Sequence, residues 1–124
     1  MPEPLALLLY EKLIPGGQLV NQLQDRGYRV QTLSDPNSLL SAAETHKPML
    51  ALIDLAANAE QVCSEIARLK SNGSTSHIPV IAMAPGANEE LHERARSAGA
   101  KLVVSDSAIL AHLDQFLDQA LQLD

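Results

Sequence analysis

One acidic residue stands where a buried strand is expected to end. Asp54 lies near the end of the apolar run Met49–Leu55, and its carboxylate is the only charge in that run. In an open parallel sheet, ligands collect at the carboxyl ends of the strands, near the point where the strand order switches. Asp54 is therefore a candidate functional carboxylate. Its position fits equally well an Asp that caps the loop or helix after the strand, and position alone leaves both interpretations open.

The residues that follow the other apolar runs would meet Asp54 at the same edge of the sheet. They are Tyr10-Glu11-Lys12 after the first run, Ala84-Pro85-Gly86 after the fourth, and Ser105-Asp106 after the fifth. No nucleophile-elbow pattern surrounds Ser105, so hydrolase chemistry has no support. The chain is not expected to be an enzyme.

Other residue types that carry chemistry are better explained as structure. Gly16-Gly17 lack the remaining positions of a phosphate-binding loop, and a tight loop before the first helix is the favoured interpretation. The four histidines have no spacing typical of a metal site. Cys63 has no base near it in sequence and is expected to be a buried, inert thiol.

The elements that position these residues are five apolar runs alternating with helical patterns. The strand candidates are Leu5–Tyr10, Tyr28–Leu33, Met49–Leu55, Pro79–Met83 and Leu102–Val104. Nearly continuous apolar runs are typical of parallel strands covered on both faces, whereas the alternating second run indicates an edge strand. The last helix is predicted over Ile109–Leu123, from leucines spaced three and four residues apart. The pattern predicts one α/β domain over residues 1–124, a flavodoxin-like (βα)5 three-layer sandwich with a parallel sheet in the order 2-1-3-4-5.

Composition excludes several functional classes. The 124 residues carry a net charge of −6, and the nine basic residues form no run, so this domain is not expected to bind nucleic acid. Only 2% of the residues are aromatic, which leaves no base-stacking surface. A single cysteine and the lack of a long apolar segment predict a cytoplasmic protein that does not enter a membrane.

Three segments carry a resemblance to a known family. They are HKPMLALIDLA around Asp54, HIPVIAMA in the fourth strand, and SAGAKLVV leading into the fifth. With them the whole chain resembles the receiver domains of response regulators in two-component signalling. The resemblance places Asp54 at the phosphoacceptor position and implies Mg²⁺ held by an acidic pair, the acceptor and a backbone carbonyl, a set of oxygen ligands suited to a hard cation. Here Glu11, Asp54 and Ala56 would bind that ion weakly at most, and no cofactor is otherwise expected.

The same resemblance exposes departures from the family. Tyr10 replaces one acidic residue, and Ala84 replaces a hydroxyl residue that would bind the phosphate. Ser105 or Asp106 stands where a lysine is needed, and the fifth strand has no aromatic switch residue. We therefore expect Asp54 to be unused as a phosphoacceptor, which defines a pseudo-receiver.

A receiver without phosphorylation would act through protein contacts. By resemblance, the contact surface for a protein partner or a homodimer is the face of the fourth helix, fifth strand and fifth helix, with Leu91, Ala95, Val103, Ala111 and Gln115. Two alternatives remain open. One is an atypical receiver phosphorylated on Asp54 with Mg²⁺, and the other is a flavodoxin-like domain that binds a small ligand above Tyr10, Asp54 and Ala84.

Overall fold

The structure of the chain, a computed structural model, describes residues 5–9, 13–33, 35–55, 59–73, 75–84 and 89–121. The strands are β1 (Leu5–Leu9), β2 (Arg29–Leu33), β3 (Leu50–Asp54), β4 (Val80–Ala84) and β5 (Leu102–Ser105). The α-helices are α1 (Leu13–Asp25), α2 (Leu39–His46), α3 (Ala59–Ser71), α4 (Glu89–Ala98), α5 (Asp106–Ala111) and α6 (Leu113–Leu121), and a short 3-10 helix, η1 (Pro36–Ser38), precedes α2. Within these described ranges no helix is both long and apolar enough to cross a lipid bilayer.

The five strands form one parallel sheet in the order β2-β1-β3-β4-β5. This confirms the predicted flavodoxin-like fold and the edge position of β2. Because all strands run in the same direction, their carboxyl ends lie along one edge of the sheet.

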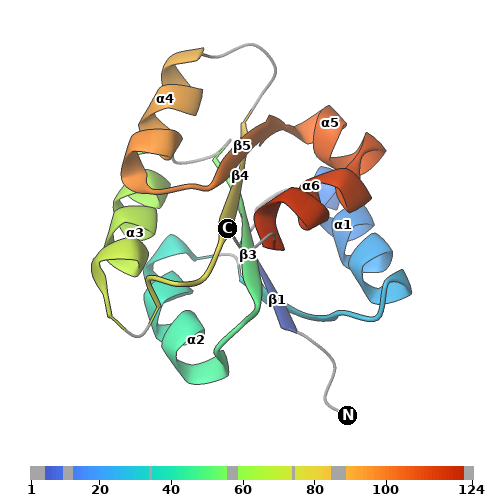
Figure 1. Ribbon diagram of the computed structural model, residues 1–124, viewed down its shortest axis with the longest axis horizontal. Coiled ribbons are helices and arrows are strands. Elements are labelled where there is room, and N and C mark those ends of the chain that lie inside the picture. The colour runs from blue at the N-terminus through green and yellow to red at the C-terminus, as the bar shows by residue number, and fades with distance from the viewer. Residues whose placement is uncertain are drawn as a thin grey trace.

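Helices cover both faces of the sheet, with α2, α3 and α4 on one side and α1, α5 and α6 on the other (Figure 1). Each strand therefore needs apolar residues in both directions. On β3, Ala51 and Ile53 face the α2–α4 side, whereas Leu50 and Leu52 face the α1–α6 side. All four are fully buried, which is the physical reason for the unbroken apolar run in the sequence.

The predicted helix over Ile109–Leu123 is wrong in its start and in its continuity. The chain enters α5 at Asp106 and leaves helical geometry at His112, where φ is −131° and ψ is 35°. A new helix, α6, then begins at Leu113. The leucine spacing survives the break, with Ile109, Leu113 and Leu117 all buried on the same side. Because the apolar repeat continues in phase from α5 into α6, the sequence pattern gives no sign of the break between them.

The start of α1 also differs from the prediction. Gly16 and Gly17 lie inside α1, which begins at Leu13. Pro15 is compatible with this, because the first N–H groups of a helix have no intrahelical acceptor. The two glycines therefore do not form the expected loop in front of the helix.

Glycine ends two of the helices in a left-handed conformation. The φ angle is +86° at Gly27 and +121° at Gly99. After α1 the Tyr28 N–H donates to the Leu23 carbonyl at 3.0 Å, and after α4 the Ala100 N–H donates to the Ala95 carbonyl at 3.1 Å. These bonds satisfy carbonyls at the helix ends, as in the Schellman motif.

Replacing Gly99 by alanine is expected to destabilise the protein more than the same change at Gly27. Both changes force a Cβ into left-handed backbone, which costs about 1–2 kcal/mol. At Gly99 the new Cβ would also lie 2.5 Å from Cγ of Lys70, whereas nothing lies within 4 Å at Gly27. Lys70 is held by bonds from Nζ to the carbonyls of Ser76 (3.1 Å) and Ile78 (2.6 Å), so moving it adds about 1–3 kcal/mol. Urea denaturation of both variants measures the difference, and equal losses would contradict this prediction.

Candidate functional site

The strand register brings three of the predicted site residues to one edge of the sheet. Asp54 is the last residue of β3 and lies opposite Met83. Ala84 ends β4 and lies opposite Ser105, the last residue of β5. Asp54, Ala84 and Ser105 therefore terminate three consecutive strands at the carboxyl edge, where ligands bind in sheets of this kind.

The sheet holds the backbone of Asp54 in place. The residue is nearly buried, with 8% of its surface exposed. Ile53 and Leu55 on either side are fully buried, and the Leu55 N–H donates to the Met83 carbonyl at 2.8 Å. This backbone bond extends the pairing of β3 and β4 past the carboxylate, so the position of Asp54 is fixed by the sheet and not by a loop.

Ala84 supplies no hydrogen bond to a phosphoryl group, and Ser105 supplies no positive charge. Ala84 is fully buried, and its methyl group can neither donate nor accept a hydrogen bond. The Ser105 Oγ accepts a bond from the Ala108 N–H at 3.2 Å, which makes Ser105 the N-cap of α5. The helix begins at the next residue, Asp106, whose side chain lies outside the described part of the structure. Because β5 leads directly into α5, Ser105 has a structural role as the cap of this helix.

The remaining members of the predicted metal site are not described. Tyr10, Glu11 and Ala56 lie outside the described residues, so the structure places only Asp54 of the expected donor set. Among the residues that are described, no three side chains of His, Cys, Asp or Glu are grouped to hold a metal ion.

The predicted interaction surface is only partly a surface. Ala95 is fully buried beneath α4, so it cannot contact a partner, and the prediction for this residue is wrong. Leu91 and Val103 are half-buried and pack against the same core cluster. The reason is that α4 is amphipathic and turns its small apolar residues toward the sheet. Ala111 on α5 is exposed, as is Gln115, which the break at His112 places on α6.

Charged residues on the helices pair in ways that the sequence did not predict. Glu90 and Arg94 have the spacing of a pair within α4, yet Arg94 lies 3.7 Å from Glu60 on α3. On the opposite side of the sheet, Arg26 at the end of α1 binds Asp114 of α6, with 3.2 Å between Nη2 and Oδ2. The hydrogen bond from Arg26 holds the pKa of the Asp114 carboxyl below its ordinary value. Both pairs join helices that are distant in sequence, so no local pattern could have indicated them.

The structure differs from the expectation of a buried Cys63, because this residue is partly exposed on α3. Its partial burial still raises the pKa of the thiol, despite the nearby positive charge of Arg94. A thiol with a raised pKa is a poor nucleophile at neutral pH. Cys63 borders an open groove between α3 and α4 that the sequence analysis missed.

Sequence comparison does not place the chain in a family. No protein-family profile matches it, and no curated protein matches it. The solved structures, by contrast, include many with the same arrangement of strands and helices.

Three of these structures illustrate the likeness. A response regulator from Chloroflexus aurantiacus J-10-fl has a TM-score of 0.88 at 14% identity, covering 97% of this chain and 98% of that one. The chemotaxis protein CheY4 of Vibrio cholerae has a TM-score of 0.84 at 16% identity, covering 97% and 100%. A response regulator from Burkholderia pseudomallei with a phosphorylated aspartic acid has a TM-score of 0.79 at 22% identity, covering 97% and 67%.

The class of protein that the fold defines is the flavodoxin-like α/β sandwich with strand order 2-1-3-4-5. Within that class, the chain has the fold of response-regulator receiver domains, over 97% of its length in each of the three comparisons. At these identities the likeness establishes the fold.

Proposed function

We propose that this chain is a cytoplasmic receiver-like signalling module that acts through protein–protein contacts, without catalysis and without phosphorylation of Asp54. The observation that carries the proposal is the strand register at the carboxyl edge. It sets Asp54 next to β4, which ends in Ala84, with β5 and its last residue Ser105 one strand further on. A phosphoryl group on Asp54 would need a hydroxyl donor at the end of β4 and a cation at the end of β5.

The energetic consequence is large. A hydrogen bond to a charged group contributes about 1.5–3 kcal/mol, so losing a lysine and a hydroxyl together removes about 3–6 kcal/mol of phosphate-linked stabilisation. Inverting a strongly biased two-state equilibrium takes about 5.5 kcal/mol. A phosphoryl group on Asp54 would therefore have little leverage over the conformation of the domain.

The contact surface that we propose is the face formed by α4, β5 and α5, for a protein partner or a second copy of the chain. Its exposed members are Ala111 and Gln115, with Leu91 and Val103 half-buried at its base. Ala95 is removed from this surface because it is fully buried.

The proposal is tested by a backbone NMR titration with Mg²⁺ followed by beryllofluoride, a stable mimic of an acyl phosphate. We expect the native chain to respond to each addition no more than Asp54→Asn does, with no shifts spreading from Asp54 to β5 and α4. Mg²⁺-dependent shifts that appear on adding beryllofluoride and are lost in Asp54→Asn would refute the proposal.

An atypical phosphorylated receiver is the second candidate, and the position of Asp54 favours it. Asp54 is a carboxylate at the end of β3, on the edge of the sheet where ligands bind in folds of this kind. In that case Glu11, Asp54 and the Ala56 carbonyl would hold Mg²⁺, whose oxygen ligands these groups match. The ion would neutralise charge on the phosphoryl group, and the NMR titration would give the positive outcome described above.

A further inference from the structure

A groove that none of the foregoing uses runs between α3 and α4. It has a volume of about 750 Å³ and is open to solvent. Small side chains line it: the half-buried Cys63 on α3 and Ala98 on α4 form its base, and the exposed Ala67 on α3 also borders it. Small residues on two adjacent helices allow a third helix to approach at the usual 8–10 Å between axes.

The base of the groove is a weakly polar environment. Cys63 and Ala98 are half-buried and pack against the core cluster on this side of the sheet. Burial raises the pKa of the Cys63 thiol even though the charge of Arg94 acts in the opposite direction. The packing of Cys63 and Ala98 on the core therefore makes this part of the groove apolar.

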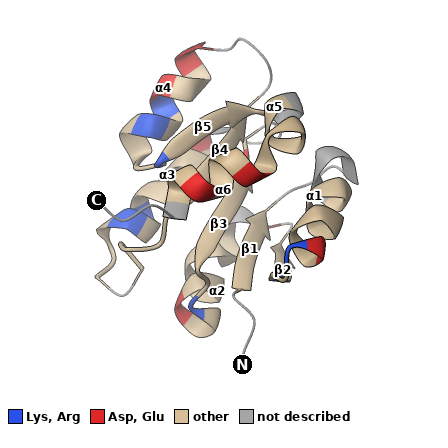
Figure 2. Ribbon diagram, turned by 45° about the vertical axis from the view of Figure 1, so that its right-hand side comes forward, with Lys and Arg blue, Asp and Glu red and all other residues tan. Residues whose placement is uncertain are grey.

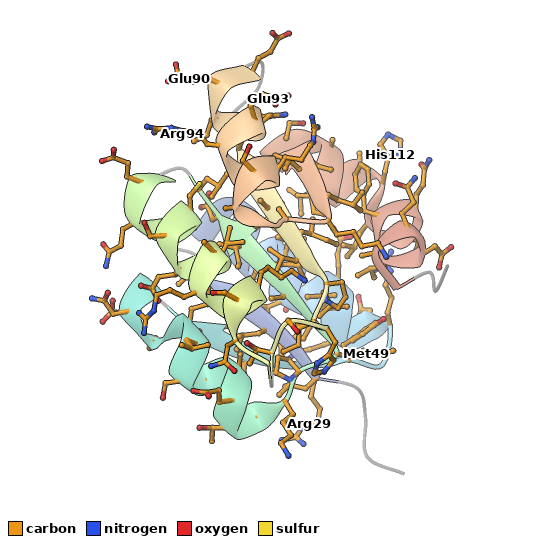
Figure 3. All side chains as sticks on the ribbon, turned by 60° about the vertical axis from the view of Figure 1, so that its left-hand side comes forward. Arg29, Met49, Glu90, Glu93, Arg94 and His112 are labelled. Atoms are coloured by element: carbon orange, nitrogen blue, oxygen red, sulfur yellow. The ribbon has the colours of Figure 1, made fainter. Side chains whose placement is uncertain are left out.

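The rim of the groove is acidic. Glu60, Glu90 and Glu93 border it, against a single basic residue, Arg94. Glu90 and Arg94 project from the outer side of α4, away from the sheet (Figure 3). A ligand that lies in the groove would therefore meet an excess of carboxylates at its edges.

The ion pairs at the rim are easily exchanged. The Glu60–Arg94 pair bridges α3 and α4 at 3.7 Å, with the two side chains 84% and 49% exposed. Glu93 pairs with Arg96 at 3.2 Å, and these side chains are 71% and 59% exposed. Exposed pairs of this kind contribute little to stability, so a partner's cations can replace them at little cost.

We propose that this groove binds an amphipathic helix of a partner protein, one that carries an apolar stripe flanked by lysine or arginine. The apolar stripe would pack on Cys63, Ala67 and Ala98, as in other helix-in-groove complexes. Its basic flanks would pair with the carboxylates of the rim. The proposal extends the protein-contact function to a second surface, and it holds whether or not Asp54 is phosphorylated.

Charge argues for a partner of different composition over a second copy. The chain has a net charge of −6, and its nine basic residues form no run. The described part of α6 shows acidic residues and no basic one (Figure 2), and one of them, Asp114, pairs with Arg26 of α1. Helix α6 of a second copy would therefore bring no basic residue to an acidic rim.

The test uses a labelled model peptide with a leucine–alanine stripe and lysine flanks, about 18 residues long so that it is helical. A peptide of the same composition in shuffled order keeps the charge and removes the stripe. Binding is measured by fluorescence anisotropy, and the rate of Cys63 alkylation reports the groove directly, because the chain has one cysteine.

Two variants locate the binding. Ala67→Arg fills the groove and adds a repelling charge, whereas Asn21→Arg introduces the same side chain at an exposed position of α1, on the opposite face of the sheet and outside both proposed surfaces. Both positions are exposed in helices, so both variants are expected to fold. If Ala67→Arg does not, Glu90→Lys at the exposed rim replaces it.

We expect the striped peptide to bind and to slow Cys63 alkylation, with binding weakened roughly tenfold by Ala67→Arg and unchanged by Asn21→Arg. Equal binding of the shuffled peptide, no binding of either peptide, or full binding by Ala67→Arg would each overturn the proposal. So would self-association of the native chain that Ala67→Arg abolishes, because the groove would then belong to a second copy. An equal loss of binding in Asn21→Arg would also overturn it, because the effect would then come from added charge anywhere on the protein.

Discussion

A receiver-like phosphate response is expected to appear when the two missing groups are put back. The double variant Ala84→Thr, Ser105→Lys places a hydroxyl and a cation at the ends of β4 and β5, beside Asp54. Each restored bond to a charged group contributes about 1.5–3 kcal/mol. Beryllofluoride should then bind Asp54 about 10²–10⁴ times more tightly than in the native chain, since 1.4 kcal/mol corresponds to a factor of ten.

The substitutions themselves carry a structural cost. Ser105 is the N-cap of α5, and losing such a cap costs about 0.5–2 kcal/mol. Ala84 is fully buried, so enlarging it costs about 1–3 kcal/mol. A variant that binds no beryllofluoride could therefore simply be damaged, and this must be controlled.

The control is the double variant Ala84→Val, Ser105→Met. Valine has the shape of threonine without the hydroxyl, and methionine has much of the length of lysine without the charge. Both double variants lose the Ser105 cap and enlarge Ala84, so comparable stabilities in urea would show that the structural costs match. Beryllofluoride titration followed by NMR should then give a response in the Thr/Lys variant alone. A folded Thr/Lys variant that stays silent would mean that other residues disable the site.

Leu52→Ala is expected to destabilise the protein strongly. Leu52 lies in β3, at the middle of the sheet, and is fully buried in the cluster on the α1–α6 side. The chain has no Trp, one Phe and two Tyr, so its core depends on close packing of aliphatic side chains. Removing a buried leucine leaves a cavity and costs about 3–5 kcal/mol.

Val30→Ala is the matched comparison for Leu52→Ala. Val30 lies on the edge strand β2 and is only partly buried against the same cluster, so its truncation should cost about 1 kcal/mol. Urea denaturation followed by far-UV circular dichroism measures both variants. A loss for Leu52→Ala no greater than that for Val30→Ala would show that the cluster is loosely packed.

The architecture was predictable from the sequence because it follows from which residues must be buried. Unbroken apolar runs such as the one that ends at Asp54 require a sheet covered on both faces, and helices between them force parallel strands. Val62, Ile66 and Leu69 have the spacing of one helix face, and all three are buried in α3. Gly99 ends α4 because only glycine adopts its backbone conformation without strain. These features depend on a residue and its near neighbours alone.

The ends of the helices were less predictable, because more than one local backbone conformation is compatible with the same sequence pattern. The helix break at His112 keeps the apolar residues in phase, so periodicity cannot detect it. Likewise Pro15 and Gly16-Gly17 are compatible with a loop or with the first turns of α1. Packing against the sheet selects between such alternatives.

The sequence predicted which residues belong to the candidate site, and the tertiary structure decided how they are arranged. The sequence alone determined that the edge holds Asp54 without a lysine or hydroxyl in the expected places. Only the register of β3, β4 and β5 set Ala84 opposite Ser105, next to the strand that ends in Asp54. The groove between α3 and α4, with Glu60 facing Arg94, likewise had no signal in the sequence. Its two sides lie some thirty residues apart, and they meet only because both helices must bury their apolar faces on the same side of one sheet.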